Sequence, residues 1–155
     1  MKNLCFLPIS LLFLSISLIA QTTATWQGGK PGRSTEWDCA ANWREGKVPD
    51  ESSQVIIPSG MVHYPVLKDV KETIDALLLE GGAELTLKKG AWLTIRCETG
   101  RLDGITLLGK IRNDGNIELC KKPPVGAMLA QGIVGSGQVI GLDSCRAASF
   151  AKNNW

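Results

Sequence analysis

Five cysteines are the most reactive side chains in this 155-residue chain. Cys5 lies in an apolar N-terminal segment, and four others follow it: Cys39, Cys97, Cys120 and Cys145. An even number of cysteines is typical of disulfides in chains that leave the cytoplasm, and four cysteines allow three connectivities. Zinc is the rival interpretation of a cysteine cluster, but no C-x-x-C pair is present. We therefore treat these four cysteines as disulfide candidates.

Three tryptophans, Trp26, Trp37 and Trp43, cluster near the start of the chain. An exposed indole face can stack on a sugar ring, which would suit a polysaccharide-binding module. The alternative is structural, because a stack of β-coils needs a plug over its raw apolar end. We favour the plug, with Asn42 bonding backbone in the turn between Trp37 and Trp43. Trp92, in a predicted strand, is assigned to core or sheet-face packing.

The titratable residues do not indicate catalysis. His63 is the single histidine, and no G-x-S-x-G motif accompanies it to supply a nucleophile. Glycoside hydrolysis needs two carboxylates a fixed distance apart. Four acidic residues are expected to face outward on one sheet: Glu84, Asp103, Asp114 and Glu118. Because a solvated sheet surface would look the same, we predict that the chain is not an enzyme.

Metal ions and nucleic acids are not expected partners. Asn113, Asp114 and Asn116 are candidate calcium ligands, but they lack the full D-x-[DN]-x-[DN]-G loop. The chain has 17 Lys and Arg residues against 15 Asp and Glu residues. A balance this close to neutral gives no electrostatic attraction to nucleic acid or to an anionic membrane. We predict no metal and no cofactor.

The first twenty residues have the order of a secretory signal peptide. A positive start precedes Leu4–Ala20, which is apolar and uncharged, and the chain then turns polar. Thr22 and Ala24 fit the small–x–small cleavage rule, so we prefer cleavage after Ala24. A cut after Ala20, with the larger Leu18 at the −3 position, is the second possibility. A retained anchor is the alternative, but the segment is at the lower length limit for spanning a bilayer. We expect no stable membrane anchor after cleavage and a final location in the periplasm, at the cell surface or in the medium.

The composition divides the chain into four segments. Residues 1–24 are the signal peptide, 25–49 a Trp-rich N-terminal cap, 50–142 a region of short β-strands, and 143–155 a polar C-terminal tail. The strands are recognised by alternating apolar and polar residues, and glycines punctuate them. Removal of the signal leaves a chain long enough for one domain.

A weak internal repeat distinguishes between β-architectures. The segments Ala91-x-Leu93-x-Ile95, Gly115-x-Ile117-x-Leu119 and Gly137-x-Val139-x-Gly141 start 24 and 22 residues apart. A recurrence of this length is typical of one coil of a β-solenoid, in which each coil buries its apolar residues against its neighbours. We predict an all-β, short, right-handed parallel β-solenoid. The alternative is a β-sandwich or barrel, with a hairpin at residues 113–116.

The same coil length suggests a pattern for the disulfides. The last three cysteines are 23 and 25 residues apart. Stacked coils lie about 4.8 Å apart, which is within the Cα separation that a disulfide allows. We favour Cys97–Cys120 and Cys39–Cys145, although Cys97 and Cys120 are offset by one position relative to their repeats.

The chain also resembles a known group of proteins. The carrying residues are Thr25-Trp26-x-Gly28, Trp37-x-x-Ala40-Ala41-Asn42-Trp43, Gly46-x-Val48-Pro49 and Val55-Ile56-Ile57-Pro58. This order resembles the N-terminal start of secreted bacterial β-solenoid proteins that are adhesin-like or autotransporter-like surface proteins. The chain departs from large adhesins because it carries no long repeat array and no C-terminal membrane barrel or sorting domain.

The resemblance implies an exported structural or adhesive surface module without enzymatic activity. Its partner would be a polysaccharide or a cell-surface protein. The alternative is a carbohydrate-binding module, or the remnant of a β-helix enzyme that degrades polysaccharides, with Trp26, Trp37 and Trp43 as the stacking residues.

Overall fold

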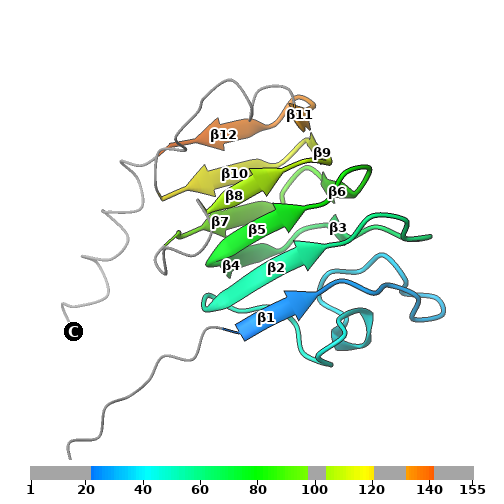
Figure 1. The fold of residues 1–155 in the computed structure, drawn as a ribbon. Helices are drawn as coiled ribbons and strands as arrows, with labels where there is room; N and C mark the ends of the chain where they lie inside the picture. Colours follow the sequence, from blue (N-terminus) through cyan, green and yellow to red (C-terminus); the bar gives the residue numbers. More distant parts are fainter. Residues whose placement is uncertain (1–21, 98–103, 121–131, 142–155) are drawn as a thin grey trace, which may run out of the picture.

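The computed structural model describes residues 22–97, 104–120 and 132–141. No helix in these ranges is long and apolar enough to cross a membrane. Short strands dominate the described residues (Figure 1). In chain order the elements are β1 (Thr22–Thr25), the 3-10 turn η1 (Ala40–Asn42), β2 (Ser53–Ile57), β3 (Val66–Leu67), β4 (Lys71–Ile74), β5 (Ala76–Leu79), β6 (Glu84–Leu87), β7 (Trp92–Ile95), β8 (Ile105–Leu107), β9 (Lys110–Asn113), β10 (Asn116–Leu119), β11 (Ile133–Val134) and β12 (Gln138–Ile140).

The strands form three sheets that the chain visits in turn. The first sheet has the order β1-β2-β5-β8, the second β11-β9-β6-β3 and the third β12-β10-β7-β4. Every ladder between these strands is parallel. The path β2–β3–β4, then β5–β6–β7, then β8–β9–β10 is therefore a stack of about three coils, seen edge-on in Figure 1. The predicted solenoid is confirmed, and the sandwich alternative is wrong because hairpins would pair antiparallel.

The predicted repeat corresponds to the coil register. Leu93 of β7 lies opposite Ile117 of β10, and Ile117 lies opposite Val139 of β12. The second sheet carries the shorter echo, with Leu85 opposite Ile111. The small–x–apolar pattern therefore predicts which residues stack on one another.

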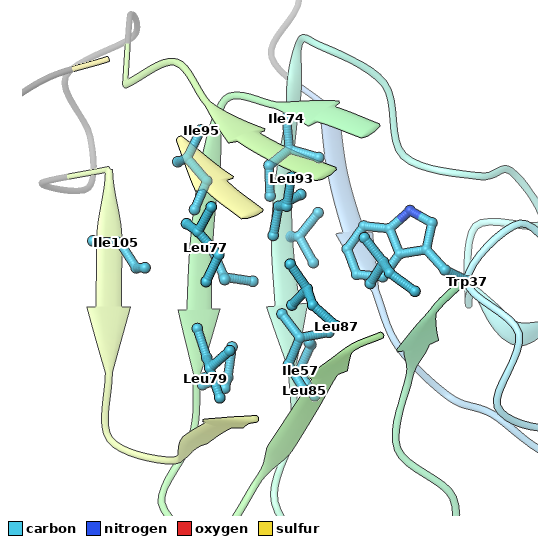
Figure 2. Packing of buried hydrophobic residues seen from close by; sticks show 14 of the residues in the cluster. Trp37, Ile57, Ile74, Leu77, Leu79, Leu85, Leu87, Leu93, Ile95 and Ile105 are labelled. Carbon is cyan, nitrogen blue, oxygen red and sulfur yellow. The ribbon is translucent and has the colours of Figure 1, made fainter. Parts of the chain in front are cut away.

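The core is a column of aliphatic side chains inside the three sheets. Strands β2, β6 and β7 bury every second residue, as expected for a sheet with one inward face. Figure 2 shows these side chains meeting between the sheets. The fully buried ones include Ile57, Leu77, Leu79, Leu85, Leu87, Leu93 and Ile95. Burial of each such side chain stabilises the fold by about 1.5–3 kcal/mol relative to exposure.

The segment 113–116 is a corner between two sheets and not a hairpin. It joins β9 of the second sheet to β10 of the third. The buried side chain of Asn113 holds the corner, since its amide donates to the carbonyl of Gln138 at 3.0 Å. The Oδ1 of Asn113 accepts the N–H of Gly115 at 3.1 Å. The predicted tight turn is real, but it turns the chain within one coil.

The N-terminal end differs from the expected segment boundaries. Strand β1 precedes the Trp-rich segment and pairs with β2, so the first sheet begins at Thr22. The Trp-rich segment is closed on itself by a bridge between Trp26 and Trp43, and a bridge between Glu36 and Val66 attaches it to β3 of the first coil. These contacts place the segment against the first coil, as expected for a cap.

Candidate functional site

The three N-terminal tryptophans form one buried cluster. Their exposed fractions are 0 % for Trp26, 1 % for Trp37 and 0 % for Trp43. Trp43 packs edge-to-face against both others, with ring centroids 5.0 Å from Trp26 and 4.8 Å from Trp37. Two indole N–H groups bond backbone, from Trp26 to His63 at 2.7 Å and from Trp43 to Trp37 at 2.8 Å. Since no ring face is open to solvent, the glycan-stacking interpretation of these residues is corrected, and the arrangement is consistent with a cap.

Asn42 lies buried inside this cap and bonds backbone, as predicted. Its amide donates to the carbonyls of Arg33 at 2.6 Å and Glu36 at 2.9 Å. Its Oδ1 accepts the N–H of Lys30 at 3.0 Å. The bonds reach the loop that precedes Trp37, not the turn between Trp37 and Trp43. The Asn42 side chain therefore stabilises the cap loop through three hydrogen bonds to its backbone.

The cysteines do not form the favoured pairs. Cys39 and Cys97 carry buried thiols. Cys97 has a positive φ of 58°, and its sulfur lies 3.7 Å from the carbonyl oxygen of Ile95. The sulfur also lies over Gly104, where a Cβ would approach it to 1.8 Å. The Cys97 sulfur thus packs against the backbone at Gly104, and the favoured Cys97–Cys120 pair does not form.

The second favoured pair is wrong as well, because Cys39 carries a thiol. Cys145 lies outside the described residues. Cys120 is half-buried directly after β10, and its bonding partner is not among the described residues. A disulfide that depends on export therefore stays a prediction.

The acidic candidates do not share one sheet. Glu84 lies on β6 of the second sheet, where it forms an ion pair with Arg112 of β9. Glu118 lies on β10 of the third sheet. Asp114 is at the corner between β9 and β10, where it accepts hydrogen bonds from the N–H and hydroxyl of Ser136 at 3.2 and 3.1 Å. These two bonds lower the pKa of the exposed Asp114 carboxyl. Asp103 lies outside the described residues.

Asn113, a candidate calcium ligand, and His63, the single histidine, both form hydrogen bonds that hold the fold together. The Asn113 side chain is already used by the corner, so it is not a free oxygen ligand. No cluster of three or more His, Cys, Asp or Glu side chains suitable for a metal exists within the described ranges. His63 is exposed, and its carbonyl accepts the indole N–H of Trp26.

The face that gathers functional side chains is the outer face of the third sheet, which we call the Trp92 face. Its inward residues alternate with two outward columns in fixed register. The columns run Lys71–Trp92–Asn116–Gln138 and Thr73–Thr94–Glu118–Ile140. Strand spacing of about 4.8 Å separates successive members. The result is a surface that combines one aromatic ring with amide, hydroxyl and charged groups.

Trp92 is fixed on this face by Glu118. The indole N–H donates to Glu118 Oε2 at 3.2 Å, and the hydroxyl of Thr94 donates to the same oxygen at 3.3 Å. Trp92 is half-buried, unlike the three tryptophans of the cap. A pre-oriented indole with polar neighbours loses little conformational entropy on binding, which is how rigid aromatic residues anchor a ligand.

From the sequence we interpreted Trp92 as a packing residue and Glu118 as a candidate catalytic carboxylate. The contact between these two residues was therefore not predicted. The two residues are 26 positions apart, and they meet diagonally because Trp92 lies opposite Asn116. The sequence does indicate the outward orientation of Trp92. Apolar and other residues alternate in β7, and because Leu93 and Ile95 point inward, Trp92 must point outward.

Two neighbouring carboxylates, Glu72 and Asp38, lie where the cap meets the first coil. Glu72 of β4 lies opposite the buried Leu93, so it occupies a core-facing position at the end of the stack. Burial raises the pKa of Glu72, and the nearby carboxylate of Asp38 raises it further. Asp38 itself lies 3.7 Å from the guanidinium of Arg33. These groups belong to the contact between cap and coil.

Comparisons with known proteins add no relative, because no family model, no curated protein and no solved structure matches this chain.

Proposed function

We propose that the chain is an exported, non-enzymatic structural or adhesive surface module that holds a polymer on its Trp92 face. The supporting observation is the Trp92–Glu118 hydrogen bond, which fixes an aromatic ring among the outward polar side chains of the third sheet. The parallel ladders keep this surface rigid, so no loop has to become ordered on binding. The partner would be a polysaccharide or a cell-surface protein.

The proposed export rests on the leader at the start of the chain and on the resemblance of the Trp-rich segment to adhesin-like surface proteins. The N-terminal motif is built as a cap in the structure, since Trp26 and Trp43 bridge each other and Asn42 fastens the loop. A stack of coils with a cap over its apolar end is suited to a stable surface module.

The absence of enzymatic activity is also a proposal, and the carboxylates support it. Glu118 Oε2 already accepts two hydrogen bonds, so this carboxylate positions Trp92. Glu84 is paired with Arg112 on a different sheet. A glycoside hydrolase needs its two carboxylates on either side of one bond.

A second candidate is a carbohydrate-binding module, and Trp92 favours it. A half-exposed indole offers an apolar face for a sugar ring, while Asn116, Thr94 and Gln138 offer donors and acceptors for hydroxyl groups. This candidate uses Trp92 and not the cap tryptophans.

The experiment is retention of the exported protein on purified immobilised polysaccharides and on purified cell-surface proteins. We expect Trp92→Ala to weaken retention by about tenfold or more, equivalent to about 1.4 kcal/mol, at a temperature where unfolding curves show that the variant is fully folded. The matched control is Lys110→Ala, because Lys110 is an exposed residue on β9 of the second sheet.

The outcomes separate the candidates. Retention on polysaccharide alone favours the carbohydrate-binding module, and retention on a surface protein favours the adhesive module. Shortening of any polysaccharide during incubation would contradict the non-enzymatic proposal. Equal retention of Trp92→Ala and wild type would show that the Trp92 face is not the contact surface.

A further inference from the structure

We infer that the export leader is removed after Ala20, so that the mature chain begins at Gln21 and keeps the whole of β1. This inference rests on the proposed export. It replaces cleavage after Ala24, which the small–x–small rule favours from sequence alone.

Strand β1 is an integral strand of the first sheet. Its four residues pair in parallel with β2, from Thr22 opposite Ser53 to Thr25 opposite Ile56. A cut after Ala24 would remove three of these four paired residues. The backbone edge of β2 would then lose the neighbour that covers it, and uncovered strand edges promote aggregation.

The side chains of β1 belong to the packed structure as well. Ala24 is 4 % exposed and is part of the hydrophobic core, opposite Val55. The hydroxyl of Thr22 lies 3.1 Å from that of Ser53, whose side chain is buried. Loss of Ala24 would uncover Val55, which is completely buried.

The junction between β1 and the cap also ties this strand into the folded chain. The N–H of Thr25, at the Ala24–Thr25 bond, donates to Glu45 Oε2 at 2.8 Å, and the carbonyl of Thr25 accepts the N–H of Arg44 at 2.9 Å. These two bonds tie the end of β1 to the cap, so a mature chain without Thr22–Ala24 would lose the strand that leads into the cap. Ala20 precedes the first paired residue, Thr22, so cleavage there leaves every β1 contact intact.

The test is the mass of the exported product after expression of the full chain with its own leader. The N-terminal peptide is also identified by fragmentation. The amine of an N-terminal glutamine can attack its own side-chain amide, forming a lactam C–N bond and releasing ammonia. A product that begins at Gln21 is therefore recognised with or without the loss of ammonia.

Two variants make the assignment specific. Thr22→Leu places a large residue at the −3 position of the Ala24 site, and Thr22 is exposed on β1, so the fold tolerates it. We expect its product still to begin at position 21. Ala20→Leu disables the −1 position of the Ala20 site, and we expect it to abolish that product.

The failures are distinguishable. A wild-type product that begins at Thr25, and that Thr22→Leu suppresses, overturns the inference while leaving export intact. A product that begins at any other residue within β1 also overturns it. A chain that is retained in the cytoplasm with its leader attached overturns the proposed export itself.

Discussion

At the scale of single residues, Asp50 stabilises the turn that leads into β2. Its carboxylate accepts hydrogen bonds from Lys47 Nζ at 2.5 Å, from the N–H and hydroxyl of Ser52 at 3.1 and 2.7 Å, and from the hydroxyl of Ser53 at 3.0 Å. The bond from Lys47 is the largest cause of a pKa well below the usual range, followed by the hydroxyl of Ser52. The ionised carboxyl is therefore favoured by folding.

Asp50→Asn should lower the free energy of unfolding near neutral pH by about 1 kcal/mol. Because the folded pKa lies below the unfolded value of 3.8, the wild-type contribution is present above about pH 4 and is lost as the pH falls through the folded pKa. Urea unfolding of both proteins across this range measures the effect. A difference that stays constant at acid pH would contradict it.

Glu72 should show the opposite pH dependence. Its folded pKa is raised, first by burial and then by Asp38, so the ionised carboxyl disfavours folding. The cost is complete above the folded pKa and disappears as the pH falls through it. Glu72→Gln should therefore stabilise the protein at neutral pH by less than about 1 kcal/mol, because half-exposed charges are screened. Urea unfolding of the wild type and of Glu72→Gln at neutral pH measures the effect. A lower free energy of unfolding for Glu72→Gln would contradict the prediction.

At the scale of elements, the corner between β9 and β10 has no room for a side chain at Gly115. A Cβ there would lie 2.4 Å from the carbonyl oxygen of Ala91 and 2.8 Å from that of Lys88, both in the coil below. Gly115→Ala should cost about 1–3 kcal/mol of stability, since backbone oxygens cannot swing aside. The matched control is Gly81→Ala, where nothing lies within 4 Å and the change should stay within about 0.5 kcal/mol. Equal unfolding midpoints for the two variants would show that the coils are not packed this closely.

The sequence predicted the coils well because each coil repeats the same physical demands. An inward apolar residue must stack on another, as Leu93 does on Ile117, and a corner needs a small residue such as Gly115. Both demands leave a local pattern. Strand β1 was missed because the sequence TTAT carries almost no such pattern, and its pairing with β2 depends on a partner about thirty residues away.

The candidate site was less predictable, because side-chain neighbours on a solenoid come from different coils. Whether Trp92 meets Glu118 depends on how many residues each corner consumes, and a shift of one residue would turn Glu118 inward. The favoured Cys97–Cys120 pairing was wrong for the same reason. Cys97 lies in a left-handed turn, which no spacing argument revealed.

At the scale of the whole molecule, the two ends of the described stack differ. The N-terminal end is closed by three buried tryptophans. At the other end Val139 of β12 is 48 % exposed, although its register partner Ile117 is fully buried. Substitution of Val139 by Thr should therefore change stability by less than about 1 kcal/mol, whereas Ile117→Thr should cost several times more, because only the latter buries an extra hydroxyl. Thermal unfolding of the two variants measures the contrast, and equal losses would indicate that both ends are covered alike.

The central claim is that binding belongs to the Trp92 face and stability to the tryptophan cap. The most direct measurement is the affinity of Trp92→Ala and Trp43→Phe for one retained polymer, recorded beside their unfolding temperatures. We expect weaker binding by the folded protein for Trp92→Ala, with only a small fall in its unfolding temperature. For Trp43→Phe we expect a larger fall in unfolding temperature at unchanged affinity of the folded protein. Weakened binding in Trp43→Phe together with full binding in Trp92→Ala would contradict it.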